Sequence, residues 1–281
     1  MTRDIFLPNG VRLGAQSFGD PADQAILLAG RSMTSWEDGF CERLADGGRF
    51  VVRYDPRDAG RSTGYPPGVP GYSLRDLAAD AVGVLDAFGV TTAHVVGASS
   101  GGWTAQLLAL DHPRRLDSLT LISTRPTAPG PADPDLPEHD RSLMAFFTAG
   151  EPDWSDRDSI VDHMTEIERL LTGRRFEFDE ARARRLAVQD YDRTADIKSH
   201  LNNLAFADAG ERWRERLGEI SVRTLVIHGT DDPFFPYGNG VALAKEIPGA
   251  ELVPLEGLGH GFPPQIHDFV VDVLLRHTAP H

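Results

Sequence analysis

Short apolar runs recur along the chain, separated by segments whose apolar residues follow helical spacing. Most of the runs are rich in Val, Ile and Leu, and Gly, Pro or Asp residues close them, as at the ends of buried strands. They occupy Val11–Phe18, Gln24–Ala29, Phe50–Tyr54, Ala93–Val96, Leu119–Ile122, Leu225–His228 and Glu251–Pro254. Strands of this kind need cover on both faces. The pattern therefore predicts an α/β fold with a mostly parallel central sheet of about eight strands and helices on both faces.

Helical periodicity fills several of the gaps between these runs. The clearest case is Leu74–Phe88, which is amphipathic, has Ser73 as a candidate N-cap and is followed by Gly89. Further helices are predicted at Trp36–Ala45, Trp103–Leu110 and Ile266–Leu275. Strands that alternate with helices are what a parallel sheet requires, because each connection must cross back over the sheet.

The alternation stops between Arg125 and Ile220. A loop rich in Pro and Asp, 126–137, opens this stretch, and the remainder has helical but no strand periodicity. Its predicted helices are one with an apolar stripe of Ile160, Met164, Ile167 and Leu171, and two more at Glu180–Asp190 and Ala195–Ala207. We expect a core formed by residues 1–125 and 219–281, and a helical cap, residues 126–218. The cap would cover the carboxyl edge of the sheet, where parallel α/β sheets bind ligands.

Composition narrows the kind of partner. The 281 residues carry a formal net charge of −14, which disfavours binding to nucleic acid or to an anionic membrane surface. Cys41 is the only cysteine, so the chain cannot form an internal disulfide, a cysteine zinc site or an Fe–S cluster. The first residues lack the apolar core of a signal peptide, and no apolar run is long enough to cross a membrane. We expect a cytoplasmic protein, monomeric or homodimeric, that needs neither metal nor cofactor.

A candidate nucleophile follows the apolar run that ends at Val96. The sequence Gly97-Ala98-Ser99-Ser100-Gly101 fits the pattern G-x-S-x-G, and a predicted helix comes directly after it. Strand, sharp turn and helix are the context in which this pattern forms a nucleophile elbow. A side chain at either glycine would collide with the neighbouring strand or helix. The turn would expose the hydroxyl of Ser99 above the sheet.

Serine is a weak nucleophile at neutral pH and needs a base, which in turn needs an acid to orient it. The turn after Leu225–His228 offers Asp232 as the acid, with Asp231 as the competing residue. The glycine-rich loop after the last predicted strand offers His260 as the base. Among the other histidines, His94 and His228 are predicted to be buried in strands, and His267 and His277 to lie on the surface of the last helix.

These motifs resemble those of the α/β-hydrolase superfamily. Its members carry Gly-x-x-Asp after the seventh strand, as in Gly229–Asp232, and Gly-His near the C-terminus, as in Gly259-His260. They also carry a turn of the form D-x-R-G-x-G-x-S, which Asp55–Ser62 matches except for Asp58 in place of a glycine. The resemblance implies an α/β-hydrolase fold with an inserted helical cap, and it supports Asp232 as the acid.

Within the superfamily, two segments of the sequence resemble those of the aclacinomycin methylesterase branch. The segments that carry this likeness are Phe18–Asp23 and Arg53–Thr63. The likeness fades in the predicted cap, so it does not name a substrate.

An acyl-transfer enzyme also needs donors for the oxyanion that forms on the substrate, and two backbone N–H groups usually supply them. Ser100 follows the nucleophile and offers one. The resemblance implies that the second comes from the loop after Gln24–Ala29, where Arg31 is the candidate and Ala29-Gly30 replaces the common His-Gly pair. Candidate residues of a substrate pocket are Trp103, Met164, His200, Leu204, Phe234 and Phe235.

The sequence therefore predicts a serine hydrolase that cleaves carboxylic esters through an acyl-enzyme, with Ser99, His260 and Asp232 in the catalytic roles. A methyl ester of a polyketide-like small molecule is one candidate substrate. The same residues could instead hydrolyse a lactone, a thioester or a carbon–carbon bond, or carry out perhydrolysis without a cofactor. A small-ligand receptor built on the same fold is the alternative from another functional class.

Overall fold

Eight strands form one sheet in the computed structural model, which describes residues 2–130 and 133–279. Their order across the sheet is β1-β2-β4-β3-β5-β6-β7-β8. The pairs β1–β2 and β2–β4 are antiparallel and all the other pairs are parallel, so the predicted mostly parallel sheet is confirmed. The strands are β1 (Thr2–Phe6), β2 (Arg12–Phe18), β3 (Gln24–Ala29), β4 (Arg49–Tyr54), β5 (Ala93–Ala98), β6 (Leu116–Ile122), β7 (Thr224–Gly229) and β8 (Glu251–Leu255). Only β1, a polar edge strand, was not predicted.

Helices cover both faces of the sheet and bury a separate apolar layer on each. In β3, Leu27 belongs to the layer under α2 (Leu74–Ala87), α3 (Ser100–Asp111) and α7 (Gly238–Glu246). Its neighbours Ile26 and Leu28 belong to the layer under α1 (Asp38–Asp46) and α8 (His267–His277). This alternation is why the strands read as continuous apolar runs.

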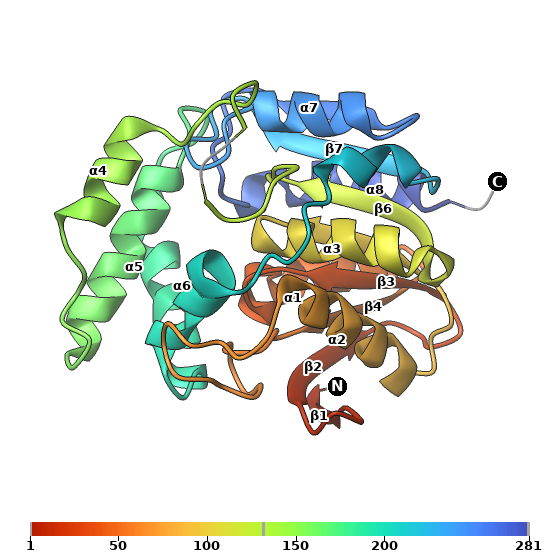
Figure 1. The fold of residues 1–281 in the computed structure, drawn as a ribbon, viewed down its shortest axis with the longest axis horizontal. Helices are drawn as coiled ribbons and strands as arrows, with labels where there is room; N and C mark the ends of the chain where they lie inside the picture. Colours follow the sequence, from red (N-terminus) through yellow and green to blue (C-terminus); the bar gives the residue numbers. More distant parts are fainter. Residues whose placement is uncertain (1, 131–132, 280–281) are drawn as a thin grey trace.

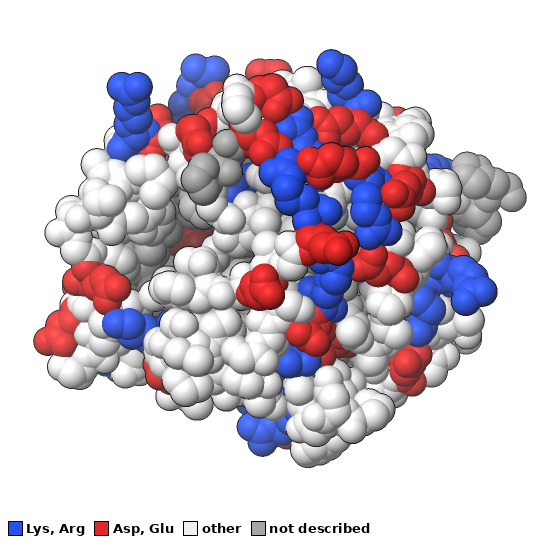
Figure 2. Space-filling view, in the orientation of Figure 1, with Lys and Arg blue, Asp and Glu red and all other residues white. Residues whose placement is uncertain are grey.

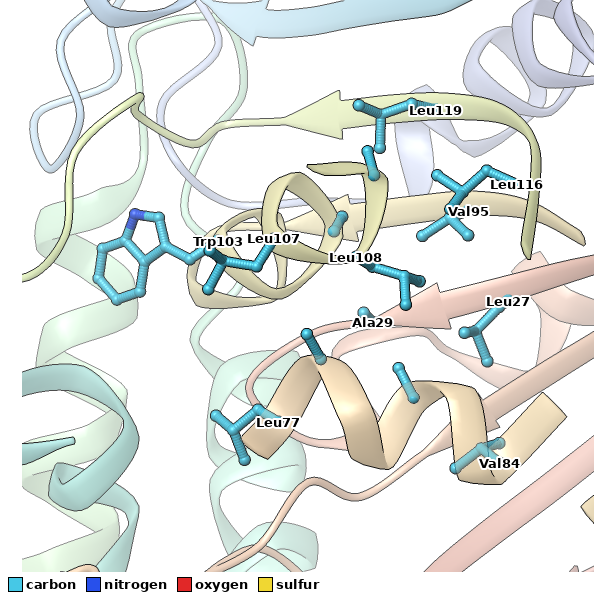
Figure 3. Packing of buried hydrophobic residues seen from close by; sticks show 14 of the residues in the cluster. Leu27, Ala29, Leu77, Val84, Val95, Trp103, Leu107, Leu108, Leu116 and Leu119 are labelled. Atoms are coloured by element: carbon cyan, nitrogen blue, oxygen red, sulfur yellow. The ribbon is translucent and has the colours of Figure 1, made fainter. Parts of the chain in front are cut away.

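Close packing holds the first of these layers together. Figure 3 shows Leu77 and Val84 along α2 and Leu108 on α3, residues that share one buried cluster with Leu27 of β3 and Val95 of β5. Replacing a buried leucine of this kind with alanine costs about 2–5 kcal/mol of stability, because the side chain's transfer energy is lost and a cavity remains. The rigid sheet that results fixes the positions of the strand ends.

The predicted ends of α2 are confirmed in atomic detail. The Ser73 hydroxyl accepts the N–H of Asp76, and the Asp76 carboxylate accepts the N–H of Ser73. This reciprocal pair satisfies two of the donors that a helix start leaves free. Gly89 follows the helix with a positive φ of 70°.

The segment between β6 and β7, residues 126–218, is called the helical insertion below. Its helices are α4 (Arg141–Ala149), α5 (Arg157–Leu171) and α6 (Glu180–Arg193). They gather at the end of the sheet toward which β6 and β7 point (Figure 1). Residues 131–132 of the proline-rich loop lie outside the described residues. The boundaries of the predicted cap, 126 and 218, remain a prediction.

One predicted helix of this insertion is irregular rather than α-helical. Within the predicted range 195–207 there is a 3₁₀ turn, Ile197–Ser199, followed by a π-helical turn, Asn202–Phe206. Here Asn202 and Asn203 turn their side chains inward and donate to Asp58 and to the carbonyl of Arg57. These buried polar contacts override the regular helical pattern that the apolar residues suggested.

Two histidines expected on the surface are buried instead. Both His267 and His277 are at most 5% exposed. Arg223 Nε donates to Nδ1 of His277 (3.1 Å), and the opposite ring nitrogen, Nε2, donates to the carbonyl of Leu119 (3.2 Å). Burial, and after it the Arg223 guanidinium, lower the pKa of His277 from 6.5 to about 4. The ring is therefore neutral in the folded protein at neutral pH.

Replacing His277 with glutamine should make the protein less sensitive to mild acid. In the unfolded chain His277 takes up a proton near pH 6.5, whereas in the folded protein it stays neutral down to about pH 4. The wild type therefore loses stability as the pH falls through this window. Between pH 7 and pH 5 we expect the free energy of unfolding to fall by about 2 kcal/mol less in His277→Gln than in the wild type. Urea unfolding at both pH values measures the difference. Equal losses of unfolding free energy in the two proteins would show that His277 does not cause the acid sensitivity.

Candidate active site

Ser99 occupies a sharp turn between β5 and α3. Its φ of 53° is unusual for a residue other than glycine, and a conformation of this kind costs about 1–3 kcal/mol. A Cβ at Gly97 would lie 2.6 Å from the Cβ of Ala105, and a Cβ at Gly101 would lie 2.6 Å from the backbone nitrogen of Gly30. Both glycines are therefore required by close approach. The turn has the geometry of a nucleophile elbow.

The structure brings the three predicted catalytic side chains together. Nε2 of His260 lies 2.9 Å from Oγ of Ser99, and Nδ1 of His260 lies 2.8 Å from Oδ2 of Asp232. With Nδ1 protonated toward the carboxylate, Nε2 is left free to accept the serine proton. The arrangement can activate a hydroxyl for attack on a carbonyl carbon.

Buried hydrogen bonds fix the carboxylate of Asp232. Its Oδ1 accepts the backbone N–H groups of Phe234 and Phe235 at 2.8 and 2.9 Å. Burial alone would raise the pKa of Asp232, but the charge of His260 and hydrogen bonds from His228 and His260 outweigh it and lower the pKa to about 2. The carboxylate is therefore ionised across the physiological range, as an orienting acid must be.

Asp231, the competing acid, points elsewhere. Its carboxylate lies 3.0 Å from Nε of Arg174, whose side chain is largely exposed. The geometry therefore favours Asp232 over Asp231 as the partner of His260.

Sequence reasoning missed the part that His228 has in the site. It was predicted only as a buried strand histidine, and it is fully buried in β7. Its Nε2 lies 2.7 Å from the carbonyl oxygen of Phe235 and 3.4 Å from Oδ2 of Asp232. Two acceptors on one ring nitrogen mean that Nε2 carries the proton. His228 thus contacts the same carboxylate oxygen that His260 binds.

The loop that carries His260 is held by the helical insertion. The backbone N–H of His260 donates to the carbonyl of Leu171, at the end of α5 (2.9 Å). The N–H of Arg175 donates to the carbonyl of Gly257 (2.8 Å). Gly173 lies so close to Gly259 that a Cβ on either would collide with the backbone beside the other. The insertion therefore helps to place the histidine.

The candidate oxyanion donors lie beside the elbow. Ser100 begins α3, whose N-terminal end favours negative charge. Arg31 follows Gly30, and the Gly30 backbone touches the first turn of α3 at Gly101. Both backbone N–H groups thus belong to segments that meet at Ser99.

Aromatic rings surround His260. The ring centroids of Phe234 and Phe235 lie 5.2 and 5.5 Å from that of His260, both edge-on. Phe234 also contacts Phe147 of α4 at 6.5 Å, a residue that sequence reasoning missed. Trp103 is buried and packs edge-on against Phe235 at 5.9 Å. Of the six predicted pocket residues, Phe234 and Phe235 are the ones with ring contacts to His260.

The other predicted pocket residues lie in the helical insertion. Met164 is half-buried on α5, and Leu204 is half-buried in the turn Asn202–Phe206. His200 is buried, with Nε2 at 3.4 Å from the hydroxyl of Thr194. Burial lowers the pKa of His200 to about 4, and the Arg31 and Arg193 guanidinium groups lower it further against the opposing charge of Asp190. It belongs to a polar cluster around Asp190 and Arg31 rather than to the contacts of His260.

The surface carries charges of both signs. Positive and negative side chains are interleaved on the face in Figure 2. Within 2–130 and 133–279, no group of three or more His, Cys, Asp or Glu side chains is placed to hold a metal ion. Over the same residues, no helix has both the length and the apolar character that a membrane crossing needs.

Asparagine substitutions should separate the two neighbouring aspartates. Asp232→Asn should lower kcat for a p-nitrophenyl ester by about 10⁴-fold, because the amide favours the wrong histidine tautomer. Asp231→Asn is the matched control and should stay within a few-fold of the wild type, since it removes only an ion pair with Arg174. Steady-state kinetics of both variants give the ranking, and the reverse order would assign the acid to Asp231.

Comparisons with known proteins agree with the fold. A family model described as alpha/beta hydrolase fold matches residues 26–263. The chain is 35% identical to rhodomycin D methylesterase DauP of Streptomyces sp. (strain C5), over 95% of each chain. It is 29% identical to a 2-hydroxy-6-oxononadienedioate/2-hydroxy-6-oxononatrienedioate hydrolase of Paraburkholderia phymatum, over 89% of this chain and 85% of that one. Among solved structures, an esterase of Exiguobacterium antarcticum superposes with a TM-score of 0.80 at 19% identity, over 99% of both chains. On the extent of these matches, the chain belongs to the α/β-hydrolase fold family.

Proposed function

We propose that this protein is a serine esterase whose substrate is a methyl ester of a polycyclic, polyketide-like molecule. The observation that carries the reaction class is the unbroken hydrogen-bond chain from Asp232 through His260 to the hydroxyl of Ser99. The substrate class rests on the 35% identity to a rhodomycin D methylesterase, which extends over 95% of both chains.

In the first half of the proposed reaction, Oγ of Ser99 attacks the ester carbonyl carbon while Nε2 of His260 takes the hydroxyl proton. Asp232, kept ionised by its surroundings, stabilises the imidazolium that forms. The carbonyl oxygen becomes an oxyanion and accepts hydrogen bonds from the N–H groups of Arg31 and Ser100. The carbon–oxygen bond to the leaving group then breaks, and His260 returns its proton to that oxygen, which releases methanol.

In the second half, water attacks the acyl-enzyme. His260 takes a proton from the water, and the same two N–H groups stabilise the second oxyanion. Cleavage of the bond to Oγ of Ser99 releases the carboxylic acid, and His260 returns the proton to the serine. The protein is regenerated without any group beyond its own side chains and water.

The surroundings of His260 support a large, planar acyl group. Rings from two parts of the chain meet there, because Phe147 of α4 contacts Phe234 beside His260. Phe146 of the same helix stacks on His163 of α5 at 4.9 Å. Fused aromatic rings pack well against such surfaces through offset-stacked and edge-on contacts. In this proposal the helical insertion is a cap that selects the substrate, and the core supplies the reaction.

Hydrolysis of a carbon–carbon bond is the rival reaction, since the 29% identical relative from Paraburkholderia phymatum is named for a substrate of that kind. The extent of the match to the methylesterase favours the ester. A side-by-side assay with a polycyclic methyl ester and a vinylogous 1,5-diketone acid would decide between them. A receptor would turn over neither substrate.

Replacing Ser99 with alanine should abolish turnover and leave the fold intact. Loss of the nucleophile in such a site costs on the order of 10⁴- to 10⁶-fold in kcat. A fluorophosphonate probe should label the wild type at Ser99, which mass spectrometry of the digested protein can locate. Circular dichroism of Ser99→Ala checks the fold. Activity above about a tenth of the wild-type value would refute the assignment of the nucleophile.

Replacing Phe147 with alanine should change selectivity rather than chemistry. We expect kcat/KM for a polycyclic methyl ester to fall by about 10-fold, since a ring contact beyond area burial is worth roughly 0.5–1.5 kcal/mol and the buried area is lost as well. Turnover of p-nitrophenyl acetate should change little. Phe269→Ala, which removes a comparably exposed ring on α8, is the control. Equal losses on both substrates would show that Phe147 has no part in recognition.

A further inference from the structure

The loop 31–37, called the oxyanion loop below, follows β3 and carries the proposed oxyanion donor of Arg31. It contains one short 3₁₀ turn, Met33–Ser35. The residue before Gly30 is Ala29, whose methyl group can form no hydrogen bond that would order the loop. Other contacts must therefore hold the Arg31 N–H in place.

One buried carboxylate of α6 binds three residues of this loop. Oδ1 of Asp190 accepts hydrogen bonds from the hydroxyls of Ser32 (3.1 Å) and Thr34. Oδ2 of Asp190 lies 3.3 Å from Nη2 of Arg31. The Asp190 side chain is 3% exposed, so these charge-assisted bonds are little weakened by solvent.

Two further contacts tie α6 to the oxyanion loop. Arg193, one turn after Asp190, forms an ion pair with Oδ2 of Asp55 (2.6 Å), and Oδ1 of Asp55 accepts the backbone N–H of Met33 (2.9 Å). Near the other end of the helix, Arg182 pairs with Glu37 at 2.7 Å. One helix of the insertion therefore holds the loop at both of its ends and in its middle.

A groove lies beside the oxyanion loop. It has a volume of about 1130 Å³ and is lined by Met33, Thr34 and Arg193 together with residues of α6 and the N-terminal strands. Neither Ser99 nor His260 lines it. Met33 and Thr34 are at most 8% exposed, so the loop forms a buried wall of the groove, and the bonds to Asp190 lie inside that wall.

We propose that Asp190 is a positioning residue that holds the oxyanion loop so that the Arg31 N–H faces the developing oxyanion. The inference rests on the esterase function proposed above. Groups that stabilise a transition state must be held to within about 0.5 Å of the productive geometry. Without the carboxylate, the hydroxyls of Ser32 and Thr34 lose their charged acceptor and are left with each other at 2.6 Å, and the loop can shift into the groove. The placement of α6 would then govern the rate of the chemical step.

Asp190→Asn tests this with a matched control on the same helix. Removal of an oxyanion donor costs about 10²–10³-fold in kcat, so a displaced donor should cost about 10- to 100-fold for p-nitrophenyl acetate with little change in KM. The affinity for a boronic acid, which forms a tetrahedral adduct on Ser99, should fall by a similar factor. The control is Asp192→Asn, whose exposed carboxylate pairs with Arg157 at 2.9 Å, and it should leave both values unchanged.

Thr34→Val and Ser32→Ala keep the proposal testable if Asp190→Asn does not fold. Each removes one hydroxyl that donates to Asp190 without altering α6, and each should lower kcat by about 3- to 10-fold, in line with the loss of one typical intramolecular hydrogen bond. Unchanged kcat in these variants, or a rise in KM at constant kcat, would overturn the positioning role. Activity in Ser99→Ala would instead overturn the proposed function. If Ser99→Ala were inactive and Asp190→Asn fully active, the positioning role of Asp190 would be wrong and the proposed function would stand.

Discussion

The contact on which the site depends is backbone against backbone, where the first turn of α3 meets β3 and β5. There is no space for a side chain at Gly97 or Gly101, so the helix can approach the strands this closely only with glycine at both places. The approach forces Ser99 into a left-handed conformation and also brings the Gly30 backbone against Gly101. One steric constraint thus sets the position of the candidate nucleophile and of both candidate oxyanion donors.

The other half of the site depends on the helical insertion. Its backbone at Leu171 binds the N–H of His260, and its Asp190 binds the oxyanion loop. The sheet alone fixes Ser99, whereas the candidate base and the Arg31 donor also rely on contacts from α5 and α6. Contacts from the insertion therefore bear on the positions of two candidate reacting groups in the core.

Strong periodic signals made the core predictable from sequence. Apolar runs between helices gave every strand except the polar edge strand β1, and glycine motifs placed Ser99, Asp232 and His260 at strand ends. The predictions that the structure does not match fail for another physical reason, which is side-chain pairing between distant parts of the chain. The turns over 195–207 follow from buried bonds of Asn202 and Asn203, and the burial of His277 follows from Arg223 and Leu119, which lie far away in sequence. Pairings of this kind leave no periodic trace along the chain.

The insertion also contacts the core at the two positions where the sequence departs from the superfamily motifs quoted above. Asp58 stands where a glycine is usual and keeps a positive φ of 68°. Its carboxylate accepts from Tyr72 of the core and from Asn202 of the insertion. Ala29 stands where a histidine is common, and Asp190 of the insertion binds the loop that follows. In both cases a residue of the insertion forms a hydrogen bond to this part of the core. The strain of about 1–3 kcal/mol at Asp58 is therefore offset by hydrogen bonds that a glycine could not form.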